Sequence, residues 1–95
     1  MIGRGIERQL KKTSKRLVLL RDELRVIDEQ LLQLSDEAAD AELRAIVSDN
    51  PGVGYEHRKA REHAEAMASH RAHVVDEIAR LEQRQDELLD QLGAG

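Results

Sequence analysis

Four histidines, His57, His63, His70 and His73, lie close together in the second half of the chain. Imidazole rings can ligate a transition metal or titrate near neutral pH. A metal site needs three or four ligands that converge on one point, whereas His63 and His70 would lie about 10 Å apart along a helix. We therefore predict no metal and no cofactor. A histidine-based metal or pH sensor is the weakest of three functional interpretations.

A basic segment near the start, with Arg8, Lys11, Lys12, Lys15 and Arg16, could contact phosphates. Proteins that bind nucleic acids usually add aromatic side chains for stacking or a motif that enters a groove. The chain has one Tyr, no Phe and no Trp. We expect the acidic C-terminal end to neutralise this segment, and nucleic acid is the weaker alternative.

Catalytic chemistry has little support in the sequence. No nucleophile has a base near it, and Gly52-Val53-Gly54 is far from a phosphate-binding loop. Carboxylates are abundant because 36% of the residues are charged. We predict that the protein is not an enzyme.

The elements that must position these groups are set by apolar residues that recur every seven positions. The first half carries Leu10, Leu17, Leu24, Leu31, Ala38 and Ala45, with Thr13, Leu20, Ile27, Leu34 and Ala41 beside them. The second half carries Ala60, Met67, Val74, Leu81 and Leu88, with Ala64, Arg71, Ile78, Gln85 and Leu92 beside them. This pattern predicts an all-α chain, an antiparallel two-helix coiled-coil hairpin formed by one domain over residues 1–95. We expect helix one at about 5–48, a turn at 49–54, and helix two at about 55–92.

The two sets of stripes match when the chain folds back between residues 52 and 53. Pro51 and the glycines beside it favour that turn, because proline ends helices and glycine permits positive φ. The resulting register places Arg21 beside Glu82 and Glu23 beside Arg84, and it sets Arg71 opposite Leu34. These opposite charges support the alignment.

More apolar residues lie outside these stripes than a hairpin can bury, and exposed apolar surface often marks a contact. One set, which we expect to form the face of a homodimeric four-helix bundle, comprises Val18, Leu19, Val26, Leu32, Ala39, Val75 and Leu89. A second set, which we expect around the hairpin tip and facing an unidentified protein partner, comprises Leu43, Ile46, Val47, Asp49, Val53, Tyr55 and Glu56.

The sequence also indicates in which cellular compartment the protein is found. There is no cysteine, and the basic start is followed by only four apolar residues, Leu17 to Leu20, too few for a signal peptide or a membrane span. We expect a cytoplasmic protein that does not bind membranes.

Asp49 and Glu56 near the turn, with Tyr55 leading into Ala60-Arg61-Glu62, make the layout similar to the N-terminal coiled coil of Gre-type transcript-cleavage factors. The similarity covers the hairpin only and departs from that family's spacing. It implies a regulator whose tip inserts into a transcription or nucleic-acid machine. The leading interpretation from the residues themselves is a bacterial-type small protein that acts as a non-enzymatic interaction or scaffolding module.

Overall fold

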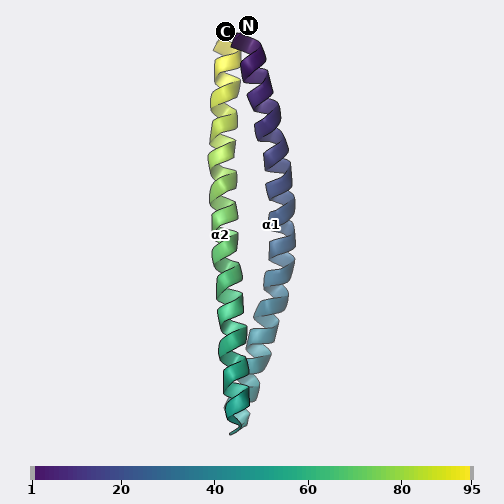
Figure 1. Cartoon of the computed structure of the whole chain (residues 1–95), viewed down its shortest axis with the longest axis vertical. Helices are drawn as coiled ribbons and strands as arrows, with labels where there is room; N and C mark the ends of the chain where they lie inside the picture. The colour runs from purple at the N-terminus through teal and green to yellow at the C-terminus, as the bar shows by residue number, and fades with distance from the viewer. Residues whose placement is uncertain (1, 95) are drawn as a thin grey trace. The chain divides into compact units, whose positions relative to one another are not determined.

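Two long helices make up the chain in the computed structural model, which describes residues 2–94 (Figure 1). Helix α1 runs over Ile2–Val47 and helix α2 over Pro51–Ala94. No strand occurs within residues 2–94. The fold is therefore all-helical, and two long helices joined by a short turn are consistent with the predicted hairpin.

Helix α1 is uninterrupted because its sequence offers strong helix formers and no proline. Leu, Arg, Glu and Ala dominate its 46 residues, and each costs little in a helix interior. The segment Ser35-Asp36-Glu37, which resembles a helix start, lies within α1. Gly3 and Gly5 are also helical, so α1 begins slightly earlier than the sequence predicted.

The turn occupies only residues 48–50, so α2 begins four residues earlier than expected. The Asn50 side-chain oxygen Oδ1 accepts a hydrogen bond from the backbone N–H of Gly52 at 2.9 Å, which caps the start of α2. Pro51 is the first helical residue, where its missing N–H would be unpaired in any case. Within residues 2–94 no glycine has a positive φ. The glycines after Pro51 thus belong to the helix and not to the turn.

The chain divides into two compact units, and each contains a segment of both helices. Unit 1 combines residues 1–24 with residues 73–95, and unit 2 consists of residues 25–72 and includes the turn. In unit 1 the purple start of α1 lies beside the yellow end of α2 (Figure 1). In unit 2 the helices flank the turn that joins them.

Burial follows the predicted stripes. Leu17, Leu20 and Leu88 are almost completely buried in unit 1, and Ile27 and Ala41 are buried in unit 2. Every stripe residue is buried or half-buried except Leu92, which is 37% exposed. The heptad pattern therefore identified the inward faces of both helices correctly.

The register differs from the expected one in both units. In unit 1, Arg84 Nη2 donates to Gln9 Oε1 at 2.9 Å, although the expected partner was Glu23, about 20 Å further along α1. In unit 2, Arg71 donates to Asp28, six residues before the expected Leu34. The expected Arg21–Glu82 ion pair is present, with Nη2 and Oε1 3.7 Å apart.

The shorter turn explains this difference. Moving the centre of the turn from between residues 52 and 53 to residue 49 shifts the pairing of the two helices by one heptad. Because the apolar pattern repeats every seven residues, the same side chains are buried in either register. Only the residues that face each other change.

The register can be tested with cysteine pairs, since the chain has no cysteine of its own. The observed register places Ala38 beside Ala60, and the expected one places it beside Met67. We expect Ala38→Cys/Ala60→Cys to oxidise within one molecule and Ala38→Cys/Met67→Cys to resist, because one heptad is about 10 Å and a disulfide spans Cα atoms less than about 7 Å apart. Non-reducing electrophoresis with mass spectrometry measures the product. Faster closure of the second pair would contradict the register.

The cap of α2 supports a second prediction. Asn50→Ala should lower the free energy of unfolding by about 1 kcal/mol, because the Gly52 N–H loses its side-chain acceptor. Asn50→Asp, which retains an acceptor oxygen, serves as the matched control and should change stability much less. Urea unfolding followed by circular dichroism provides the measurement. Equal losses in the two variants would show that the cap is unimportant.

Candidate protein-contact surfaces

A second apolar face lies on α1 within unit 2. It consists of Leu32, Ala39, Leu43, Ile46 and Val47, which we call the outer stripe. All five are exposed, and Ile46 and Val47 are more than three-quarters exposed. At 3.6 residues per turn they lie within an arc of roughly 100°, the width that an amphipathic helix normally buries. This segment of α1 therefore carries one apolar face that is buried and one that is not.

The outer stripe joins residues that the sequence assigned to two different sites. Leu32 and Ala39 were expected on an oligomer face, and Leu43, Ile46 and Val47 around the tip. Their helical positions place them on one continuous face of α1. Val26, also in unit 2, is only 39% exposed.

The remaining residues predicted at the tip do not share one environment. Val53 is half-buried, one heptad before Ala60 in the inward stripe of α2. Tyr55 is 56% exposed, and Lys59 Nζ lies 5.6 Å from the centre of its ring. Asp49 is exposed in the turn, whereas Glu56 Oε2 lies 3.9 Å from Arg44 Nη2. Tyr55, Asp49 and Glu56 are therefore exposed polar groups near the turn, and Val53 belongs to the inward stripe.

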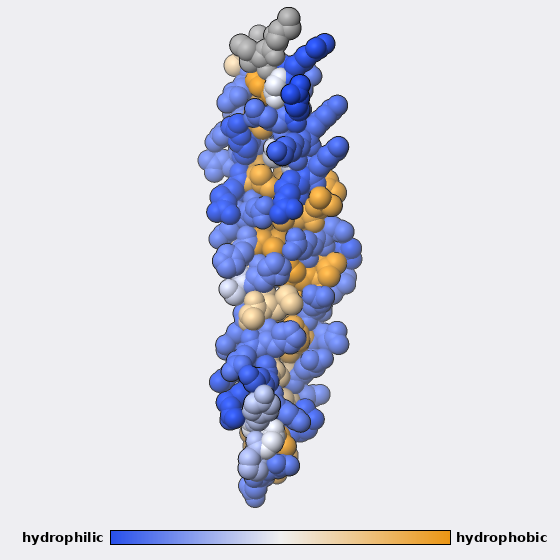
Figure 2. All heavy atoms as spheres, viewed as in Figure 1, coloured by the Kyte–Doolittle hydropathy of each residue, from blue (hydrophilic) through white to orange (hydrophobic). Residues whose placement is uncertain are grey.

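Unit 1 has its own exposed apolar residues on α1. Val18 and Leu19, each more than 60% exposed, line a shallow and mainly apolar hollow of about 320 Å³ together with Lys15. Orange side chains reach the surface between blue ones on the face shown in Figure 2. The predicted α2 residues Val75 and Leu89 are exposed to 37% and 51%.

The basic segment is neutralised only in part. Arg16 Nη2 lies 3.1 Å from Glu77 Oε1, and Arg21 pairs with Glu82, so two cations meet the acidic end of the chain as expected. Within residues 2–94, the other cations at the start of α1 form no ion pair; they are Arg4, Arg8, Lys11, Lys12 and Lys15. The start of α1 therefore carries exposed positive charges that the acidic end of the chain does not neutralise.

Two polar residues in the inward stripe of α2 are satisfied by residues that flank the stripe on α1. Gln85 Nε2 donates to Ser14 Oγ at 3.0 Å in unit 1, and Arg71 donates to Asp28 in unit 2. The hydrogen bond to Asp28, with the carboxylate's negative charge, raises the pKa of Arg71. Ser14 and Asp28 are as far apart in sequence as Arg71 and Gln85. This matched spacing was the sequence signal that could have revealed the true register.

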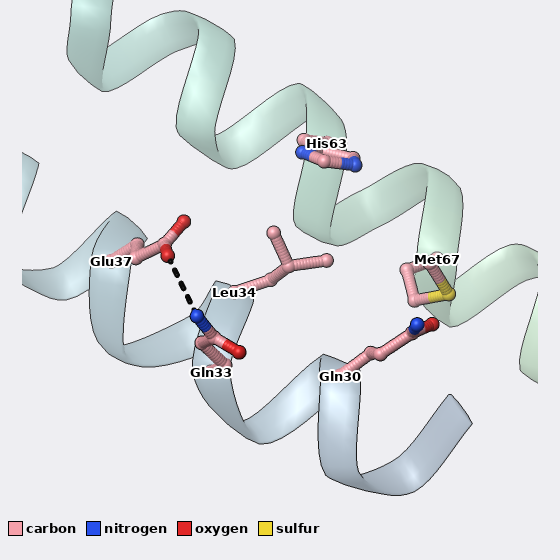
Figure 3. Close-up of a pocket in the computed structure, with 6 residues that line it drawn as sticks. All are labelled: Gln30, Gln33, Leu34, Glu37, His63 and Met67. Atoms are coloured by element: carbon pink, nitrogen blue, oxygen red, sulfur yellow. Dashed lines mark hydrogen bonds between the residues drawn. The ribbon is translucent and has the colours of Figure 1, made fainter. Parts of the chain in front are cut away.

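An open groove of about 340 Å³ lies in unit 2 between the helices (Figure 3). Leu34 extends from α1 towards α2, where His63 and Met67 form the opposite side. Gln33 Nε2 donates to Glu37 Oε1 at 3.4 Å on the rim, and Gln30 completes it. The groove offers an apolar floor with amide, carboxylate and imidazole groups above it.

The four histidines do not come together. His57 is half-buried at an inward position, and its Nδ1 is buried without a hydrogen-bond partner. His63 lines the groove, and His73 is exposed. Among residues 2–94 no three His, Cys, Asp or Glu side chains are arranged to hold a metal ion. Neither helix is long and apolar enough, over the same residues, to cross a membrane.

The chain matches none of the protein-family models, curated proteins or solved structures with which it was compared.

The Arg71–Asp28 pair supports a prediction about stability. Asp28→Asn should lower the thermal midpoint modestly, because a half-exposed cation in the inward stripe loses its carboxylate. Adding Arg71→Leu should restore the midpoint or raise it, since an apolar residue then replaces the unpaired charge. Glu29→Gln, which alters an exposed pair within α1, is the matched control and should have little effect.

Circular dichroism melts at neutral pH measure these midpoints. Because the pKa of Arg71 is raised, the guanidinium stays charged through the neutral range, and its contribution to stability is lost as the pH rises into strong alkali. An Asp28→Asn midpoint equal to that of Glu29→Gln would contradict the stabilising role.

Proposed function

We propose that this protein is a non-enzymatic interaction or scaffolding module, an antiparallel coiled-coil hairpin that associates with a second copy through the outer face of α1. The observation that carries the proposal is the outer stripe in unit 2, which is as wide as a normal buried face and is exposed along its whole length.

The energetic argument rests on the size of these side chains. Full burial of a Leu, Ile or Val contributes about 1.5–3 kcal/mol relative to exposure. Leu32, Leu43, Ile46 and Val47 are each more than 60% exposed. Packing this face against another helical face would remove that surface from water, and two hairpins can do so as a four-helix bundle.

The outer stripe is a stronger candidate than the exposed apolar residues of α2. Val75 is already close to two-thirds covered, and Leu89 lies fourteen residues away from it. Neither belongs to a continuous exposed stripe comparable to that of α1. We therefore place self-association on α1.

The proposal is tested by polar substitution in the outer stripe. Leu43→Gln/Ile46→Gln should dissociate the dimer, because two exposed apolar anchors are lost without disturbing the inward stripe. Val75→Gln/Leu89→Gln is the matched control on α2 and should remain dimeric. Sedimentation velocity measures the mass, and circular dichroism checks that both variants stay helical. A wild-type chain that is monomeric at high micromolar concentration contradicts the proposal.

Insertion of the tip into a transcription machine stays a prediction. Of the two acids on which the resemblance rests, Glu56 pairs with Arg44, whereas Asp49 has no ion pair within the described residues 2–94. No feature of the tip favours this mode over self-association.

A further inference from the structure

The unpaired cations at the start of α1 form one face of the helix. Arg4, Arg8, Lys11 and Lys15 follow one another at intervals of four, three and four residues and lie within an arc of roughly 60°. We call them the basic face. None forms an ion pair within the described residues 2–94, and Val18 and Leu19 follow directly along the helix.

Two acids accompany the outer stripe in unit 2. Asp36 lies within the arc of the stripe and Asp40 lies at its edge. Both are exposed, and neither has an ion-pair partner in the part of the chain that the structure describes. The outer stripe is therefore an apolar surface with unpaired negative charge.

We propose that the second copy docks with its α1 antiparallel to this α1, so that the basic face of each protomer lies on the outer stripe of the other. This inference rests on the proposed self-association and adds its orientation and register. The two lysines are four residues apart, and so are the two aspartates. Because the partner's α1 runs in the opposite direction, Lys11 faces the partner's Asp40 and Lys15 faces the partner's Asp36. A two-fold axis repeats both contacts.

The same register matches other residues along the two helices. It sets Leu19 opposite the partner's Leu32, both more than 60% exposed. It also sets Glu7, the only acid in the first 21 residues, opposite the partner's Arg44.

Two like-charged pairs arise in this register: Asp22 faces the partner's Glu29, and Glu23 faces the partner's Asp28. Arg25 Nη1 lies 3.3 Å from Glu29 Oε1 within each chain and offsets the repulsion in the first pair. Asp28 is paired with Arg71 of its own chain, which offsets the repulsion in the second.

The charges choose the arrangement, and the affinity comes from apolar burial: Leu19 packs on the partner's Leu32, and the aliphatic stems of Arg4 and Arg8 cover the partner's Val47 and Leu43. An exposed ion pair contributes at most about 1 kcal/mol, so these pairs alone cannot hold a dimer. A parallel arrangement would instead place each basic face against the other. Like charges in contact disfavour that alternative and thereby select the antiparallel one.

Complementary charge reversal tests the inference. Lys11→Glu/Lys15→Glu should weaken self-association at least tenfold, and so should Asp36→Lys/Asp40→Lys, because each variant sets like charges against each other. An equimolar mixture of the two variants should form a heterodimer, since every contact in the mixed pair regains opposite charges. Arg58→Glu/Arg80→Glu makes the same change in net charge as the lysine variant, on exposed residues of α2; it is the control and should dimerise like wild type.

Sedimentation velocity at low and high salt measures the wild type, the two charge variants, their mixture and the control, with circular dichroism to confirm helicity. Heterodimer formation that weakens with salt supports the inference. A wild-type dimer with charge variants that dimerise unchanged overturns the inference but leaves the proposed function intact. A wild-type monomer overturns both. A monomer that binds a 20-base-pair duplex DNA with steep salt dependence also overturns both and assigns the cations to phosphates.

Discussion

The hydrogen bond between the Gly52 N–H and the Asn50 side chain is the constraint on which the rest of the structure depends. It fixes the first residue of α2 and so places the centre of the turn at residue 49. In a helical hairpin the centre of the turn determines which residues face each other. Arg71 meets Asp28 and Gln85 meets Ser14 because the turn has this length. A longer turn would bury the same leucines and leave these two polar groups facing different partners.

The sequence predicted burial well and pairing poorly, for one physical reason. Leu17, Leu20 and Leu88 recur at heptad spacing, and that spacing alone identifies an inward face. A repeat of seven is unchanged by a shift of seven, so the apolar pattern cannot distinguish neighbouring registers. Asn50 and Pro51 distinguish the registers, because they are a helix cap and a proline at the first helical position. The same two residues also match the end of the preceding helix, and that is the role expected of them from the sequence. Exposure of the outer stripe could be predicted, and the single helix expected at about 5–48 already implied its continuity from Leu32 to Val47, although its residues were assigned to two separate sites.

Helix α1 differs from α2 in carrying two apolar faces. The inward face packs against α2, whose polar stripe residues Arg71 and Gln85 donate hydrogen bonds to Asp28 and Ser14 of α1. The opposite face of α1 has unpaired cations in unit 1, and in unit 2 it has unpaired acids beside exposed Leu, Ile and Val. Such a helix resembles an inner member of a bundle more than an outer one, because an outer helix needs only one apolar face.

Separation of charge along α1 gives this second face a direction. If cations and acids alternated evenly, an antiparallel and a parallel partner would be equally acceptable, and the apolar side chains could slide by one turn at little cost. Concentrating Arg8, Lys11 and Lys15 before the acids at 36 and 40 removes that degeneracy, since only one orientation brings opposite charges together. Apolar contact and charge order thus have separate roles on the same helix. The first favours association, and the second restricts it to a single geometry.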